Sequence, residues 1–122
     1  NLSPTRDLTY VKDTCKGFLE IFNSNSLLGE TTNIGMNSEI SIGDLTNLIG
    51  ELLDIKIKIK SSDERIRPSK SEVERLYCDN SKLLKHTSWK PRYSLKQGIK
   101  EVINWMKDPQ NLSRYKSERY NV

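Results

Sequence analysis

The chain has 122 residues, which is enough for one domain with a core of its own. Hydrophobic residues make up 34% and charged residues 30%, and no apolar run approaches the roughly 18 residues of a membrane-spanning helix, so we expect no membrane partner. The net charge of +4 favours an anionic partner, which leaves nucleic acid and phosphorylated small molecules open.

The two cysteines argue against a disulfide framework and a zinc site. Cys15 and Cys78 lie far apart, without CxxC spacing, and His86 is the single histidine. We predict two buried, reduced thiols in a cytoplasmic protein. The start "NLSPTRDLTY" lacks the basic and apolar regions of a signal peptide.

The first part of the chain predicts a strand, a helix and a second strand. "RDLTYV" is rich in β-forming residues and is expected to be extended. A helix is expected from about Lys12 to Asn23, and "TTNIGM" reads as a short strand. The apolar residues at helical spacing are Val11, Thr14, Cys15, Phe18, Leu19 and Phe22.

A second helix and a third strand follow. Ser41 followed by Asp44 resembles a capping box, and a continuous apolar face runs from Leu45 to Leu53. "IKIKIK", Ile55 to Lys60, alternates strictly and predicts a strand with isoleucines inward and lysines outward. Such a face usually just meets water, although it can also hold a polyanion.

The last part predicts a loop, two helices and a tail. A loop around Pro68 leads into an extended "ERLYCD", and then Asp79 or Asn80 caps a short helix through Leu83 and Leu84. Trp89 is the expected apolar anchor of the next connection. A final helix begins at Ser94, with Gln97 three residues later, and Pro109 stops it. We therefore expect a domain over residues 1–109 and a tail over 110–122.

Two arginines are the main candidates for ligand binding. Arg6 heads the strand "RDLTYV" and Pro68 restrains Arg67. A guanidinium presents a rigid fork of donors that fits phosphate oxygens, so two converging arginines can clamp a diphosphate. The alternative is a pair of surface ion pairs worth about 0–1 kcal/mol each, which is the commoner role. In those pairs, Arg6 would meet Asp7 or Asp13, and Arg67 would meet Glu64 or Glu72.

The order of the motifs resembles a known family. Nearly the whole chain is similar to the C-terminal part of extended short-chain dehydrogenase/reductases that act on nucleotide sugars, above all the 4,6-dehydratases. The stretches that carry this resemblance are "RDLTYVKDTCKGFLEIF", "TTNIGMNSEISIGDLTNLI" and the segment from "RIRPSKSEVERLYCDN" to "VINWM". The resemblance implies a mixed α/β fold, the substrate-binding portion of a Rossmann-type enzyme, with about three main helices and short strands.

The resemblance also implies roles for single residues. Arg6 and Arg67 match the arginines that contact the diphosphate of the nucleotide sugar, and Glu72 matches an acidic residue that reaches ribose hydroxyls. "RPSKSEV" is longer than the family's "RPTEV" form, so the match of Glu72 depends on the register of the loop. Asp13 matches an acid that we interpret as a structural cap.

Two motifs of the family are absent from this sequence. No GxxGxxG or GxGxxG occurs, and no tyrosine has a lysine four residues later. We therefore expect the C-terminal part of a larger NAD-dependent dehydratase or epimerase. Its missing N-terminal domain would bind NAD, and this part would neither bind NAD nor turn over substrate alone. The resemblance to the dehydratases implies that in the whole enzyme NAD would take a hydride from C4 of the hexose, water would leave across C5 and C6, and the hydride would return at C6.

Two other functions stay open. One is a small basic nucleic-acid-binding module that uses Lys56, Lys58 and Lys60, although interleaved acidic residues and the lack of a known motif make nucleic acid the weaker partner. The other is a packing or dimerisation unit. We also expect "TTNIGM" to be an unpaired sheet edge, and an exposed apolar face through which the chain self-associates.

Overall fold

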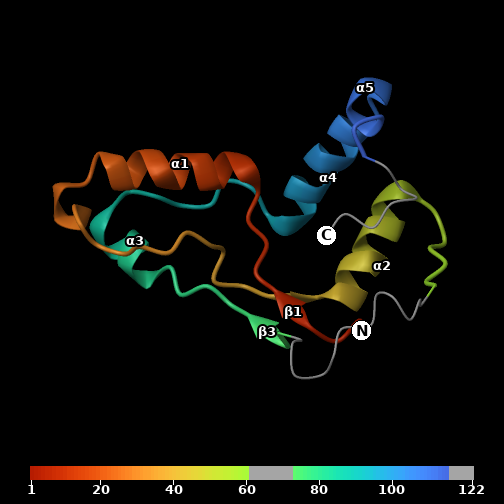
Figure 1. Cartoon of the computed structure of the whole chain (residues 1–122), viewed down its shortest axis with the longest axis horizontal. Coiled ribbons are helices and arrows are strands. Elements are labelled where there is room, and N and C mark those ends of the chain that lie inside the picture. The colour runs from red at the N-terminus through yellow and green to blue at the C-terminus, as the bar shows by residue number, and fades with distance from the viewer. Residues whose placement is uncertain (61–72, 116–122) are drawn as a thin grey trace.

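The computed structural model describes residues 1–60 and 73–115, which form a mixed α/β structure as predicted. Three helices of 12 residues dominate this part of the chain: α1 (Val11–Phe22), α2 (Ile42–Leu53) and α4 (Leu95–Met106). Shorter helices are η1 (Asn25–Leu27), α3 (Ser81–His86) and α5 (Pro109–Leu112). In Figure 1, α1 and α3 lie on one side and α2, α4 and α5 on the other.

Local side-chain caps explain where these helices begin. Ser41 accepts a hydrogen bond from the N–H of Asp44 at 3.0 Å, and Ser94 forms a full capping box with Gln97. Both caps confirm the prediction. Pro109 was predicted only to end the preceding helix. In the structure it is also the first residue of the short helix α5, which Asp108 caps.

A small sheet joins distant parts of the chain. Its strands are β1 (Thr5–Arg6), β2 (Ile40–Ser41) and β3 (Arg75–Leu76), in the order β2-β1-β3. β1 pairs antiparallel with β2 and parallel with β3. The predicted strand "RDLTYV" is thus confirmed only at its start, because Leu8 to Tyr10 form no ladder.

Two predicted strands are wrong. Residues 31–36 are not a strand, because side chains bond their backbone in place of a ladder: Met36 donates to the Asp7 carboxylate and Gly35 accepts from Asn80. Residues 55–60 are irregular, and Ile55 and Ile59 are 56% and 58% exposed. No described strand pairs with either segment. A sequence that alternates apolar and polar residues forms a strand only where a neighbouring strand can pair with it.

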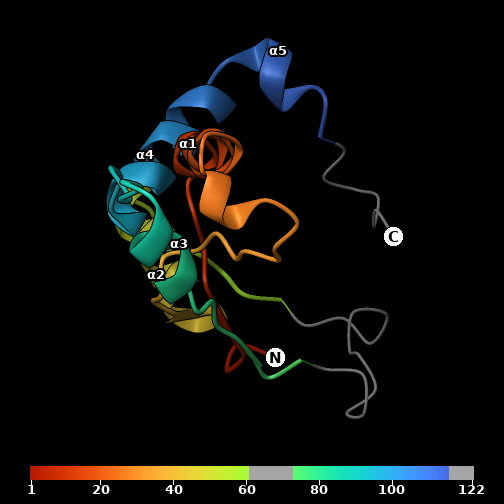
Figure 2. The ribbon, with the colours of Figure 1, turned by 90° about the vertical axis from the view of Figure 1, so that its left-hand side faces the viewer.

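The core is small and centres on Trp89. Trp89 is 1% exposed, and its indole Nε1 donates to the carbonyl of Asp13 at 2.9 Å. Leu27 and Leu83 are the other buried hydrophobic residues of the described chain. The structure thus confirms the prediction that Trp89 is the apolar anchor of the connection before α4. The view of Figure 2 looks along α1 and shows the helices gathered on one side of the extended segments.

The prediction of two buried thiols is wrong for Cys15, which is exposed on α1, and Cys78 is half-buried. Both cysteines are free. Among residues 1–60 and 73–115, no helix combines the length and the apolar character that crossing a membrane requires.

Candidate functional site

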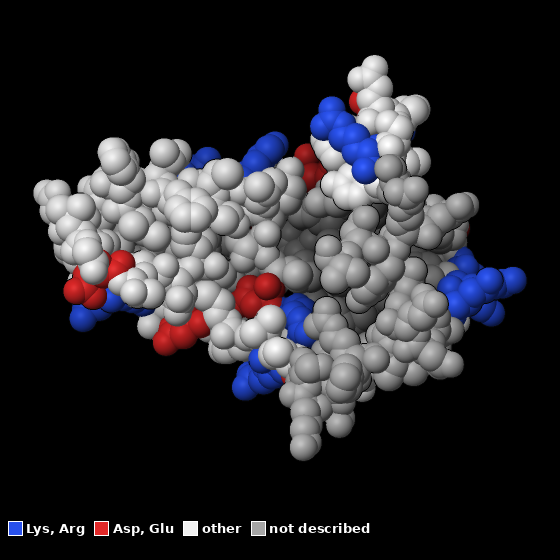
Figure 3. Space-filling view, viewed as in Figure 1, with Lys and Arg blue, Asp and Glu red and all other residues white. Residues whose placement is uncertain are grey.

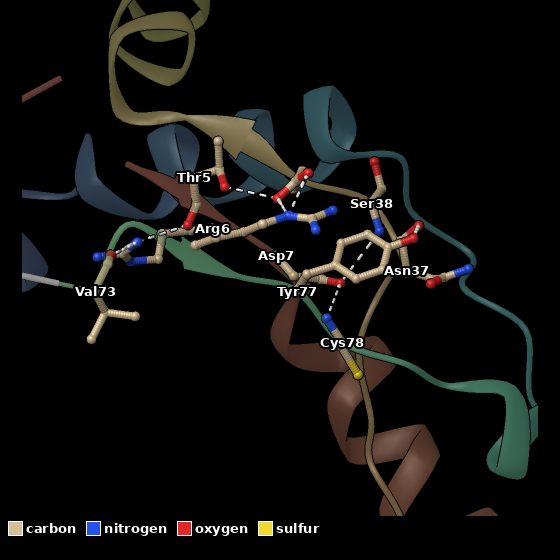
Figure 4. Close-up of polar contacts among 10 residues, drawn as sticks. Thr5, Arg6, Asp7, Asn37, Ser38, Val73, Tyr77 and Cys78 are labelled. Carbon is tan, nitrogen blue, oxygen red and sulfur yellow. Dashed lines mark hydrogen bonds and ion pairs between the residues drawn. The ribbon is translucent and has the colours of Figure 1, made fainter. Parts of the chain in front are cut away.

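Arg6 lies in β1, the central strand of the sheet, and its side chain reaches the backbone just before β3. Its Nη1 donates to the carbonyl of Thr5 at 2.7 Å and to the carbonyl of Val73 at 2.8 Å (Figure 4). These two bonds orient the guanidinium plane. Val73 directly follows the segment that contains Arg67 and Glu72, so Arg6 lies beside the point where that segment rejoins the sheet.

Arg67 and Glu72 lie outside the described residues, so their roles stay predictions. The extended "ERLYCD" that follows them is present as predicted, with Arg75–Leu76 paired to β1. The parallel pairing of β1 with β3 fixes the position of residues 75 and 76 beside Thr5 and Arg6.

A hollow of about 190 Å³ lies beside Arg6. This is smaller than the ~300–1,000 Å³ of a typical ligand pocket, so the hollow alone is too small to enclose a ligand of nucleotide size. Three segments line the hollow: β1 and the residues just after it, the loop that leads into β2, and the start of α4. The lining residues are Arg6, Leu8, Met36, Ser38, Glu39, Ile40, Ser94 and Leu95.

Asp7 holds one wall of this hollow in place. Its carboxylate accepts hydrogen bonds from the backbone N–H groups of Met36 at 2.8 Å, Ser38 at 3.3 Å and Cys78 at 3.3 Å (Figure 4). Between Met36 and Ser38, Asn37 has a left-handed φ of 54°, which this residue type tolerates. From the sequence, Asp7 was a candidate only as an ion-pair partner of Arg6. Its place directly after Arg6 was the available signal.

Glu39 forms a second polar group at the hollow. Its carboxylate accepts from the Nε of Arg75 at 2.8 and 3.0 Å and from the hydroxyl of Thr5 at 2.7 Å. The hydrogen bond from Arg75 is the main reason that the pKa of Glu39 is lowered, and Thr5 lowers it further. Arg75 thus balances the negative charge of Glu39. The arginine also stacks on Tyr77, with 4.8 Å between its guanidinium carbon and the ring centroid.

Asp13 has the structural role that the sequence predicted, in a more buried form. It is 1% exposed, and its carboxylate accepts from the N–H groups of Arg92 at 3.0 Å and Tyr93 at 3.1 Å. These bonds fix the connection before α4 against α1. Asp79 also acts at a helix start, since it accepts from the N–H of Ser81 at 2.9 Å, whereas Asn80 donates to Gly35.

The described residues do not fit the pyrophosphate of NAD. Such a site needs glycines where the backbone approaches the phosphates at the start of a helix. The turn from β2 to α2 has only Gly43, and a Cβ built there would lie 3.5 Å from its nearest neighbour, so nothing demands a glycine. In the same part of the chain, no cluster of histidine, cysteine or acidic side chains is placed to hold a metal ion.

The predicted basic face of residues 55–60 is not formed. Lys56, Lys58 and Lys60 are all exposed, but the segment is not a strand, so the strand face that the alternation predicts is absent. In Figure 3, blue and red groups lie near each other on the face shown, without one continuous basic field. The observation on which a nucleic-acid-binding surface depended is therefore absent from the described residues.

Comparisons with known proteins agree on one family. The sequence model described as GDP-mannose 4,6 dehydratase matches residues 1–102. A protein of Methanocaldococcus jannaschii, provisionally named UDP-glucose 4-epimerase, is 39% identical over 106 residues, which are 85% of this chain and 32% of that protein. The chain spans about a third of the length of the curated relatives it matches.

Solved structures show the same fold. An epimerase from Methanothermobacter thermautotrophicus matches with a TM-score of 0.81 at 24% identity, over 93% of this chain and 33% of that chain. A dTDP-glucose 4,6-dehydratase from Bacillus anthracis, in complex with NAD, matches with a TM-score of 0.73 at 23% identity, over 91% of this chain and 34% of that chain.

Proposed function

Since the chain belongs to the extended short-chain dehydrogenase/reductases, the family of the NAD-dependent epimerases and dehydratases, we propose that it binds the nucleotide diphosphate of a nucleotide sugar. It would serve an NAD-dependent 4,6-dehydratase or epimerase in the cytoplasm and would not be catalytic alone. In this proposal Arg6 and Arg67 bind the diphosphate and Glu72 accepts hydrogen bonds from ribose hydroxyls.

One contact supports the proposal most directly. Arg6 bonds to the carbonyl of Val73, which is the residue after Glu72. An arginine in the central strand therefore lies at the end of the segment that carries the other two proposed ligand-binding residues. The hollow beside Arg6 has room for a part of the ligand, such as one phosphate or sugar ring.

The chemistry of such a site is binding and orientation. Guanidinium groups donate paired, charge-assisted hydrogen bonds to phosphate oxygens. Interactions with this non-reacting part of the substrate position the sugar for the reaction, so their binding energy contributes to the rate elsewhere in the enzyme. NAD supplies hydride transfer in such enzymes, and none of the described residues is assigned to it.

Titration calorimetry of the full chain with UDP-glucose, dTDP-glucose and GDP-mannose tests the proposal. Loss of one charge-assisted contact worth about 1.5–3 kcal/mol predicts that Arg6→Ala and Arg67→Ala each weaken binding roughly 10- to 150-fold. Arg114→Ala, an exposed arginine next to α5, is the matched control and should bind like the wild type.

Two results would contradict the proposal: no binding of any of the three ligands at millimolar concentration, or binding that both arginine substitutions leave unchanged. Oligonucleotide binding that falls steeply with added salt would instead favour the nucleic-acid-binding module.

A further inference from the structure

We draw no further inference here: the strongest candidate, the exposed apolar side of α1 that includes Phe18, Leu19 and Phe22, carries none, because nothing in the described part of the chain shows what covers it.

Discussion

The carboxylate of Asp7 accepts a hydrogen bond from the N–H of Met36 at 2.8 Å, which ties the end of β1 to a turn 29 positions further along the chain. The same carboxylate holds Ser38 and Cys78. Met36 and Ser38 both line the hollow beside Arg6. Asp7 is therefore a positioning residue, which holds the wall of the proposed site.

Replacing Asp7 should weaken ligand binding without removing a ligand contact. Asp7→Ala leaves three backbone N–H groups without their acceptor, and we expect the affinity for nucleotide sugars to fall about tenfold. Asp7→Asn keeps one acceptor oxygen and should lose less. Asp108→Ala, which removes a carboxylate that accepts a backbone N–H far away in α5, is the control for calorimetry. Equal affinities for Asp7→Ala and wild type would refute the positioning role.

Replacing Asp13 should mainly lower stability. Asp13→Ala leaves the N–H groups of Arg92 and Tyr93 unpaired in a buried place, and we expect a loss of about 2–4 kcal/mol in the free energy of unfolding. Urea denaturation followed by the fluorescence of Trp89 and Trp105 measures it. Glu101→Ala on the exposed side of α4 should change stability by less than about 0.5 kcal/mol. A similar small change for Asp13→Ala would contradict the structure.

Gly35 is required for the close packing of two segments. A Cβ at Gly35 would lie 2.3 Å from the Cβ of Cys78, so Gly35→Ala forces these backbones apart and should cost about 1–3 kcal/mol. Gly43→Ala meets nothing closer than 3.5 Å and lies in a helix, where alanine is preferred, so it should be neutral or stabilising. Thermal unfolding of both variants compares them, and equal midpoints would count against the close approach of Gly35 to Cys78.

The pairing of Glu39 predicts a specific acid dependence of stability. Because Arg75, and then Thr5, lower the pKa of Glu39 below its usual 4.5, the ionised carboxylate stabilises the folded state above that pH. This contribution is lost as the pH falls through the lower, folded-state pKa. We expect Glu39→Gln to flatten part of the fall in melting temperature between about pH 5 and pH 3. An unchanged acid profile would show that the pair adds nothing to stability.

The two thiols should react at different rates. Cys15 is exposed, whereas burial, followed by the charges of Asp7 and Asp79, raises the pKa of Cys78 above its usual 9.0. Since the thiolate is the reactive form, a thiol reagent at mildly alkaline pH should show a fast phase from Cys15 and a slow phase from Cys78. Cys15→Ser should remove only the fast phase. A single phase with both thiols reacting together would disagree with this environment for Cys78.

The helices were predictable because their signals are local. Ser41 with Asp44, and Ser94 with Gln97, lie within one turn of the backbone groups that they bond, so the sequence contains both partners. The strands were not predictable in the same way. "IKIKIK" has the right alternation, but a ladder needs a neighbouring strand, and alternation does not say whether one is there.

In the candidate site, too, the sequence predicted what a local motif indicates and did not predict contacts between distant positions. Arg6 was a candidate from its motif, and it does line a hollow, while Arg67 and Glu72 lie outside the described residues. The bonds of Asp7 to Met36 and of Glu39 to Arg75 join positions 29 and 36 apart, which no local pattern indicates. An exposed apolar face was expected, but its place on α1 was not, because periodicity identifies the apolar side of a helix and not what that side faces.

The pairing of Thr5 with Arg75 also sets an order of events during synthesis. At about 5–20 residues per second, the ribosome makes α2 roughly 1–4 seconds before β3, and α1 earlier still. The helices can form early from local contacts, whereas Arg6 gains its second neighbouring strand only when β3, which begins 69 positions later, has been made. Arg6 therefore takes its place in the complete three-stranded sheet later than the helices α1 and α2 can form.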